Sequence, residues 1–154
     1  VPAFGPERRG ALATGVVRIG EERILLRCGA MRPHALLVID PTIWHVANVT
    51  LGLVEDGMII LNTPASPDEV ETELRDGRYG YSLGVERCSI FTVDATGIAL
   101  QHLGRPITNT AMMGALSAAT GLLEMATIEE VFVERFGDDA PANIAAARAA
   151  AEGV

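Results

Sequence analysis

Lysine is absent from this sequence, because all 12 basic side chains among its 154 residues belong to arginine. Schiff-base catalysis requires a lysine amine, so an aldolase-type mechanism is excluded for this chain. The formal net charge is −8, and no cluster of basic residues offsets the acidic ones. A track for the phosphate backbone of DNA or RNA is therefore not expected.

Cysteine is also rare, since the sequence holds only Cys28 and Cys88, which form no CxxC motif. A 4Fe-4S cluster needs four cysteine thiolates, so this chain cannot supply them alone. We expect both cysteines to be free thiols in a reducing cytoplasm. His34, His45 and His102 show no spacing typical of metal ligands or of catalysis.

Long hydrophobic runs are missing as well. The apolar stretches are of strand length or are interrupted by polar residues, and they fall short of the roughly 20 residues that a membrane helix requires. No signal peptide is visible at the start of the sequence. We therefore expect a cytoplasmic protein that has no membrane contact.

The hydrophobic residues that are present make up 49% of the chain, enough for one compact domain with a substantial core. Apolar runs alternate with helical segments, which is typical of a three-layer α/β domain. The expected buried parallel strands are Leu36–Ile39, Met58–Leu61 and Ser89–Val93. Ala11–Ile19 and Arg23–Arg27, separated by a short turn, predict an antiparallel hairpin, so we expect a mixed, mostly parallel sheet.

Polar residues follow each expected parallel strand and can start the next helix. These starts are Asp40 before Pro41, Ser66 with Glu69 as a capping box around Pro67, and Asp94; Thr127 with Glu130 repeats the box further on. The strand ends would bring Asp40, Asn62, Thr63 and Asp94 to one rim of the sheet. We expect these side chains to satisfy backbone N–H groups of the following helices rather than to act in catalysis.

A further helix is expected between Thr108 and Leu123. Its apolar stripe recurs at helical spacing and consists of Met112, Ala115, Leu116, Ala119 and Leu123. Gly114, Ala118 and Gly121 form a second line of small residues, which would let another backbone approach closely, inside the domain or between subunits. At the helix start, we expect Thr108 or Asn109 to cap the exposed N–H groups, which would otherwise favour an anion.

The first ten residues form a Gly/Pro-rich turn that carries Glu7, Arg8 and Arg9. Two adjacent guanidinium groups offer forked donors suited to a phosphate or a carboxylate. A solvated charged turn, partly neutralised by Glu7, is the alternative interpretation.

Phe4–Gly10 is similar to a motif near the start of the gamma subunit, or gamma domain, of the 2-oxoacid:ferredoxin oxidoreductases, the pyruvate:ferredoxin oxidoreductase family. Further segments agree with the family in the same order, and they are Val17–Gly20, Leu37–Pro41, Ile59–Thr63, Val93–Thr96 and Gly104–Met112. Glu134–Phe136 and Asn143, in an alanine-rich stretch, resemble the family's ending. Members usually open with a strand and a glycine-rich turn before the first motif. The resemblance therefore implies a single gamma-type domain over residues 1–154 that lacks its first βα unit.

The resemblance implies an assembly that oxidatively decarboxylates a 2-oxoacid, transfers the acyl unit to coenzyme A and passes electrons through 4Fe-4S clusters to ferredoxin. Thiamine diphosphate and Mg²⁺ would belong to thiamine-binding alpha and beta subunits, and a ferredoxin-like subunit would complete the hetero-oligomer. This chain is expected to be inactive alone, to complete the assembly and to help shape coenzyme A access.

The residues expected to contact coenzyme A or a partner subunit are Arg8, Arg9, Gly10, Asn109 and Thr110; no catalytic residue and no metal ligand is assigned. Pyruvate is the leading substrate, because Arg105–Met112 and Asp40–Pro41 look most like the pyruvate branch. The alternatives are a gamma-type subunit for 2-oxoisovalerate, 2-oxoglutarate or indolepyruvate, a stand-alone coenzyme- or nucleotide-binding α/β module, and a purely structural interaction domain.

Overall fold

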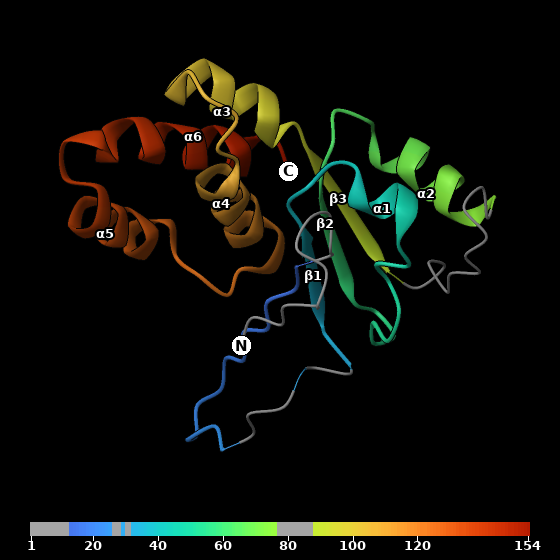
Figure 1. Cartoon of the computed structure of the whole chain (residues 1–154). Coiled ribbons are helices and arrows are strands. Elements are labelled where there is room, and N and C mark those ends of the chain that lie inside the picture. Colours follow the sequence, from blue (N-terminus) through green and yellow to red (C-terminus); the bar gives the residue numbers. More distant parts are fainter. Residues whose placement is uncertain (1–12, 26–28, 30–31, 77–87) are drawn as a thin grey trace.

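The computed structural model describes residues 13–25, 29, 32–76 and 88–154. Within these residues, a three-stranded sheet in the order β1-β2-β3 lies between two groups of helices (Figure 1). The elements are β1 (Ala35–Val38), α1 (Ile43–Val46), β2 (Met58–Asn62), α2 (Pro67–Arg75), β3 (Ser89–Val93), α3 (Ala95–Leu103), α4 (Asn109–Thr120), α5 (Met125–Phe136), the short 3-10 helix η2 (Gly137–Asp139) and α6 (Ala140–Glu152). The expected three-layer α/β class is confirmed.

All three strands run parallel, with Leu36 opposite Ile59 and Ile60 opposite Phe91. The strands form where short, β-branched or aromatic apolar runs occur, and β2 in the middle is apolar on both faces. Ile59, Ile60 and Leu61 are each 0% exposed. The predicted strands therefore agree with the structure to within one residue at either end.

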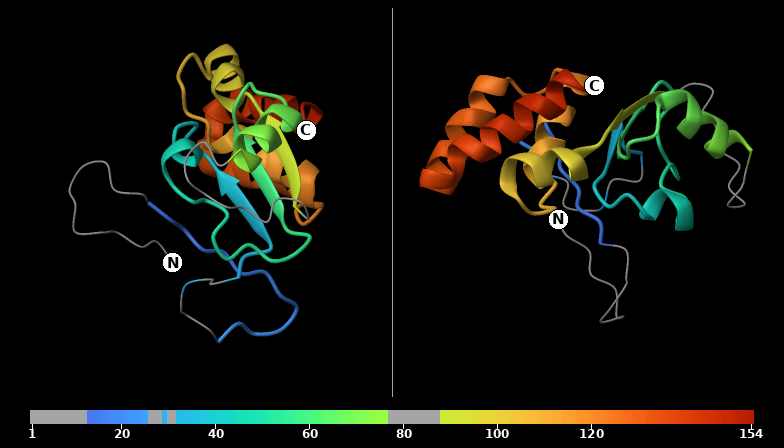
Figure 2. Two further views of the ribbon diagram at one scale, coloured as in Figure 1. Left: turned by 90° about the vertical axis from the view of Figure 1, so that its right-hand side faces the viewer. Right: turned by 90° about the horizontal axis from the view of Figure 1, so that it is seen from above.

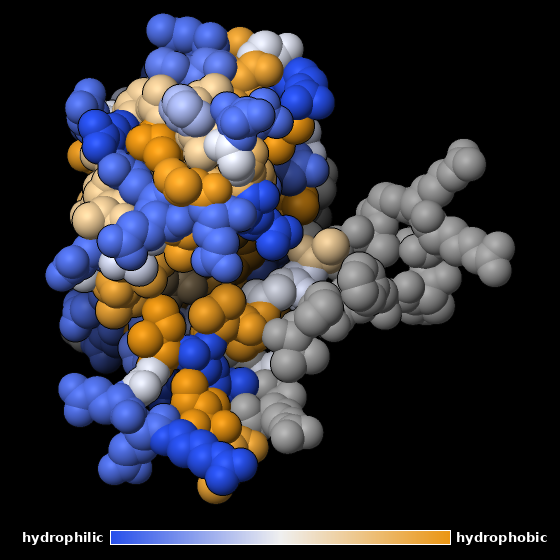
Figure 3. All heavy atoms as spheres, turned by 90° about the vertical axis from the view of Figure 1, so that its left-hand side faces the viewer, coloured by the Kyte–Doolittle hydropathy of each residue, from blue (hydrophilic) through white to orange (hydrophobic). Residues whose placement is uncertain are grey.

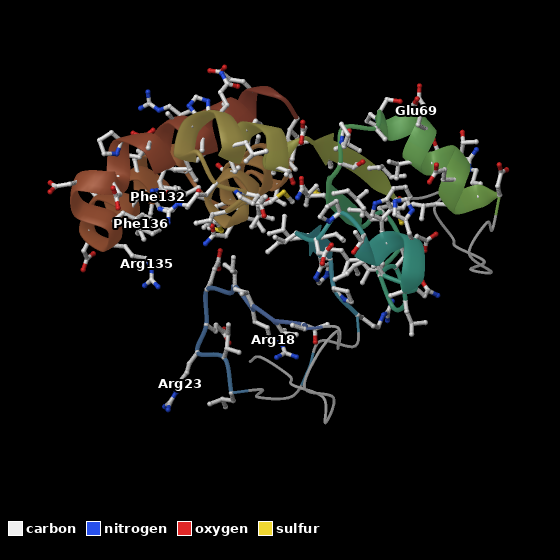
Figure 4. All side chains as sticks on the ribbon, turned by 45° about the horizontal axis from the view of Figure 1, so that its top comes forward. Arg18, Arg23, Glu69, Phe132, Arg135 and Phe136 are labelled. Atoms are coloured by element: carbon white, nitrogen blue, oxygen red, sulfur yellow. The ribbon has the colours of Figure 1, made fainter. Side chains whose placement is uncertain are left out.

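Alternation along the strands sends side chains to two faces of the sheet, and each face has its own cover (Figure 2). Ile59 and Leu61 face α1 and α2 in one cluster, which includes Trp44 and Leu74. Ile60 faces α3, α4 and α6 in the other cluster. Helix α5 packs outside α4 and α6 through a third cluster built on Ile128 and Phe132; Figure 4 shows Phe132 on α5, at the opposite end of the molecule from Glu69 on α2.

Local signals fix several helix ends. Ser66 and Glu69 form the predicted capping box at the start of α2, with Pro67 in its first turn. Asp94 caps α3, which ends at Gly104 in the left-handed region with φ 66°, a conformation that glycine adopts without strain. The second predicted box, Thr127 with Glu130, is wrong, because α5 begins at Met125 and Thr127 lies inside its first turn; Glu124 is the N-cap residue and makes no side-chain capping bond.

Of the three small residues predicted to form a line on α4, Gly114 makes an internal contact, whereas Ala118 and Gly121 are exposed. A Cβ atom added at Gly114 would collide with the backbone oxygen of Ala147 in α6. Glycine is therefore required there because two helix backbones meet without a side chain between them. The approach at Gly114 lies within the domain and not between subunits.

The antiparallel hairpin expected from residues 11–27 does not form over the part of that segment that the structure describes. Residues 13–25 contain no strand, and Thr14 alone is a bridge residue. Val17 is 84% exposed and Leu25 is 74% exposed, so no apolar layer supports strand pairing here, and a two-stranded hairpin without such support is marginal in water. Arg18 Nη2 donates to Gly29 O at 3.1 Å. Figure 3 views this side of the molecule and shows hydrophobic side chains exposed among hydrophilic ones, and Figure 4 places Arg18 and Arg23 on this segment.

Candidate functional site

The carboxyl ends of the parallel strands form a rim, the part of an open α/β sheet where ligands usually bind. Asp40 lies two residues beyond β1, Asn62 is the last residue of β2, and Asp94 directly follows β3. Because the strands pair in parallel register, these three positions share the same edge of the sheet. The four residues predicted for this rim differ in how far their hydrogen bonds reach.

Asp40 organises its own turn. Its Oδ1 atom accepts hydrogen bonds from the backbone N of Thr42 at 2.9 Å and from Thr42 Oγ1 at 2.7 Å. These two hydrogen bonds lower the pKa of Asp40, with the backbone bond as the larger cause. The side chain is an exposed carboxylate that closes the turn before α1, as predicted.

Asp94 and Thr63 also act locally. Asp94 Oδ1 accepts a hydrogen bond from the backbone N of Gly97 at 2.8 Å, which caps α3. Thr63 Oγ1 accepts from the backbone N of Ala65 at 3.2 Å, within the turn that leads to α2. The predicted role is confirmed for Asp94, which satisfies an N–H group in the first turn of α3, whereas the bond of Thr63 lies in the turn before α2 begins.

Asn62 differs from its neighbours because its hydrogen bonds reach the turn after β1 and the first turn of α3. Its Nδ2 atom donates to Ile39 O at 2.8 Å, and its Oδ1 atom accepts from the backbone N of Thr96 at 3.2 Å. The side chain is only 1% exposed. The sequence predicted a cap for the following helix, but Ser66 fills that role, and nothing in the local sequence around Asn62 indicated contacts 23 and 34 residues away.

The start of α4 holds two of the residues predicted to contact a ligand or a partner. Asn109 is exposed in the first turn. Thr110 is 3% exposed, and its Oγ1 atom has no hydrogen-bond partner among the described residues. Thr108 occupies the N-cap position but makes no side-chain capping bond, so the prediction that Thr108 or Asn109 caps the helix by its side chain is wrong. Asn109 is therefore the accessible member of the pair, whereas Thr110 is covered.

Arg8, Arg9 and Gly10 lie outside the described residues. Their contacts with coenzyme A or with a partner subunit stay predictions, as does any relation between them and Asn109.

The described residues do not provide a ligand set for a metal centre. No group of three His, Cys, Asp or Glu side chains in them could hold a metal ion. Cys88 is partly buried, and burial is the main cause that raises the pKa of its thiol, with a smaller contribution from Asp56. The whole sequence has two cysteines, too few for the four thiolates of a 4Fe-4S cluster. The groups present here therefore do not fit an iron–sulfur centre.

A shallow depression on the outer side of α2 carries several carboxylates. It is lined by Pro64, Ala65, Asp68, Glu69, Thr72 and Glu73. Glu69 is held by the capping box through bonds from the backbone N and the Oγ atom of Ser66, at 2.8 and 2.9 Å, and Glu73 Oε2 lies 3.8 Å from His45 Nδ1 on α1. Glu69 therefore caps α2, and Glu73 lies against α1.

The complete sequence was compared with known families and proteins. Residues 1–153 match the family described as pyruvate ferredoxin/flavodoxin oxidoreductase. The chain belongs to this family. The resemblance seen in the sequence motifs is thereby confirmed.

Individual relatives agree with the family assignment. The chain is 41% identical over 152 residues to the pyruvate/ketoisovalerate oxidoreductases common subunit gamma of Pyrococcus abyssi, covering 98% of this chain and 77% of that protein. It is 38% identical over 152 residues to the pyruvate synthase subunit PorC of Methanothermobacter marburgensis, with the same coverage of 98% and 77%.

A solved structure has the same fold. The crystal structure of pyruvate oxidoreductase subunit PORC from Thermotoga maritima superimposes with a TM-score of 0.67 at 33% sequence identity, covering 80% of this chain. The chain spans 65% of the length of that solved chain. In the part of the chain that the structure describes, no helix has the length and apolar character needed to cross a membrane.

Proposed function

We propose that this chain is the gamma-type subunit of a 2-oxoacid:ferredoxin oxidoreductase, with pyruvate as the substrate of the assembly. The observation that carries the proposal is the family match over residues 1–153, together with relatives that are named as gamma or PorC subunits of pyruvate oxidoreductases. In this proposal residues 1–154 act as one gamma-type domain of a cytoplasmic hetero-oligomer.

The assembly would oxidise and decarboxylate the 2-oxoacid, form the acyl thioester of coenzyme A and deliver electrons to ferredoxin. Thiamine diphosphate with Mg²⁺ supplies the carbanion-stabilising chemistry of such an enzyme when bound, and we assign both, together with the 4Fe-4S clusters, to partner subunits. The assignment of the clusters is supported by the cysteine content, since the two cysteines of the sequence are too few for the four thiolates of one cluster. The isolated chain is expected to be inactive.

The contribution that we propose for this chain is to complete the assembly and to shape the path of coenzyme A. Asn109 is exposed in the first turn of α4, and the preceding Thr108 gives that turn no side-chain cap. Backbone N–H groups at such a helix start favour anionic groups. Arg8 and Arg9 would add forked donors for a diphosphate or for acidic groups on a partner.

A second 2-oxoacid is favoured by a specific observation. Several relatives are named as a common gamma subunit of pyruvate and ketoisovalerate oxidoreductases. We propose that this chain can serve both activities, because in such an assembly the 2-oxoacid would be held by other subunits.

Co-purification at native expression level tests the proposal. The proteins that travel with this chain are identified, and the pool is assayed for coenzyme A-dependent oxidation of pyruvate and 2-oxoisovalerate with a low-potential electron acceptor. Co-elution of thiamine-binding and cluster-binding proteins with activity is expected. A chain that elutes alone from an inactive pool would favour a stand-alone binding module instead.

The role of the arginine pair is tested in the same complex. Arg8→Ala combined with Arg9→Ala should raise the KM for coenzyme A while the complex stays intact, if the pair contacts coenzyme A. Arg23→Ala, on the exposed segment of residues 13–25, serves as a matched control. Dissociation of the subunits in the double variant would instead assign the pair to a subunit interface.

A further inference from the structure

Three of the four polar side chains at the rim form hydrogen bonds only within their own turn, whereas the fourth forms hydrogen bonds to two other segments of the chain. The hydrogen bonds of the Asp40 and Asp94 side chains reach two and three residues along the chain. Those of the Asn62 side chain reach across 23 residues to Ile39 and across 34 residues to Thr96. Asn62 is thus the rim side chain that connects the end of β2 to the turn after β1 and to the first turn of α3.

The geometry of this connection uses both ends of the carboxamide. Asn62 Nδ2 donates to Ile39 O, directly after β1, and lies 3.0 Å from Thr96 Oγ1 in the first turn of α3. Asn62 Oδ1 accepts from the backbone N of Thr96 and lies 3.3 Å from its Oγ1 atom. A buried amide that is bonded on both sides has one orientation, so the turn after β1 and the start of α3 are held at a fixed separation.

We infer that Asn62 is a positioning residue for the coenzyme A-dependent step of the assembly. It acts through Ile39 and Thr96 by holding the turn after β1 against the start of α3, at the rim where ligands of open α/β sheets bind. This inference rests on the proposed function, since coenzyme A is the nucleotide-like substrate that the assembly would bring to such a rim.

Stability alone does not explain an amide at this position. Asn62 ends a strand whose three preceding residues are fully buried and apolar, and a polar group in such a place is costly unless every hydrogen bond is made. The following helix has its own cap in Ser66, and α3 has its own cap in Asp94. The bonds of Asn62 therefore add a fixed relation between two turns that already have local support.

The test uses the complete assembly carrying variants of this chain. Asn62→Leu keeps the branched outline of the side chain, with two larger methyl groups in place of the amide oxygen and NH2 group, and removes both ends of the link. We expect the KM for coenzyme A to rise about fivefold, which corresponds to about 1 kcal/mol of binding free energy, while kcat stays within about twofold, because the reacting centre is not altered. Thr96→Val removes only the hydroxyl group and should raise the same KM by a smaller factor, and Thr96→Ser, which retains the hydroxyl group, should restore it.

Asn143→Leu is the matched control for loss of a buried asparagine. Asn143 is 8% exposed and donates to Asp139 O at 2.8 Å within α6 and the turn before it, so its loss should lower the melting temperature without changing the KM for coenzyme A. An unchanged KM in both Asn62→Leu and Thr96→Val would overturn the inference, as would an equal KM change in Asn143→Leu or loss of the subunit from the complex. A wild-type assembly without coenzyme A-dependent activity would instead overturn the proposed function itself.

Discussion

The two faces of the sheet are covered by side chains of different size. On the face beneath α1 and α2, the buried cluster contains Val38, Trp44, Ile59, Leu61, Val70 and Leu74. On the face beneath α3, α4 and α6, most of the buried helix positions are alanines, and the cluster contains Ile60, Val93, Ala95, Ala111, Met112, Ala115, Ala146 and Ala150. Large side chains fill the space between layers on the first face, whereas small ones let the helices approach on the second.

This difference determines which kind of substitution each face tolerates. A layer held by large side chains loses stability when atoms are removed, because a cavity remains. A layer in which backbones touch loses stability when atoms are added, because the backbone cannot move aside cheaply. Gly114 and Ala147 show the second case, since a side chain on Gly114 would collide with backbone atoms.

Removing the largest side chain of the first face should have the largest effect. Trp44 is 3% exposed, and its Nε1 atom has no hydrogen-bond partner among the described residues. We expect Trp44→Ala to lower the free energy of unfolding by about 3–5 kcal/mol, measured by denaturant titration. Trp44→Phe should cost less, because it leaves a smaller cavity and removes an unsatisfied N–H group. Leu51→Ala, at a side chain that is 79% exposed, is the control.

Adding one methyl group between α4 and α6, two of the helices that cover the second face, should have the next largest effect. We expect Gly114→Ala to lower the free energy of unfolding by about 1–3 kcal/mol despite the better helix propensity of alanine. Ala147→Gly in the same chain should not restore stability, because the colliding atoms of Ala147 belong to its backbone. Gly153→Ala meets atoms only at 3.6 Å or beyond and should be nearly neutral. Restoration by Ala147→Gly would show that the contact is not limited by the backbone.

Much of this arrangement could be predicted from the sequence, because its causes are local. The parallel strands follow from short apolar runs, and the start of α2 follows from Ser66, Pro67 and Glu69. The hairpin prediction for residues 11–27 was wrong over the described residues, since apolar alternation indicates pairing only where another layer covers the side chains. The sequence did not predict that Gly114 contacts Ala147, because a line of small residues shows that another backbone can approach closely but does not identify that backbone.

Fewer contacts of the candidate site could be predicted from the sequence. Asp40 and Asp94 were correctly interpreted as residues that hold their own turns, since capping preferences act over two or three residues. The link from Asn62 to Ile39 and Thr96 depends on which strands are neighbours, and this information is absent from the local sequence. Asn109 and Thr110 are adjacent in sequence, but only the structure separates the exposed side chain from the covered one.

The starts of α2 and α5 allow the same comparison at smaller effects. Helix α2 covers the first face of the sheet, and α5 packs outside the helices that cover the second face. Ser66→Ala removes a confirmed cap and should cost about 1 kcal/mol, whereas Thr127→Ala, inside α5, should be neutral or slightly stabilising. The backbone N–H of Ser66 is the larger cause and its hydroxyl group the smaller cause that lower the pKa of Glu69, so removal of the hydroxyl group should raise that pKa only part of the way toward its ordinary value. This contribution is present above the unfolded-state pKa and is lost as the pH falls through the lowered one. An equal cost of both substitutions in denaturant titrations would contradict the assigned start of α5.

The smallest expected effect concerns the exposed ion pair between α5 and α6, which lies outside the small-residue layer. Arg148 Nε and Nη2 donate to the two carboxylate oxygens of Glu129 at 2.6 and 2.8 Å, and this hydrogen bonding is the main cause that lowers the pKa of Glu129. Arg148→Gln should raise that pKa, as followed by NMR titration of the carboxyl group, with little change in stability and less change still at high salt. The pair stabilises the fold at pH values above the unfolded-state pKa of Glu129, and this stabilisation is lost as the pH falls through the lowered pKa of the folded state.

The control for this prediction is Arg135→Gln, an exposed substitution on α5, which should leave the pKa of Glu129 unchanged. A large loss of stability in Arg148→Gln would mean that α5 is held by this pair rather than by Ile128 and Phe132, and the contrast between the two covers would then not rest on side-chain size alone.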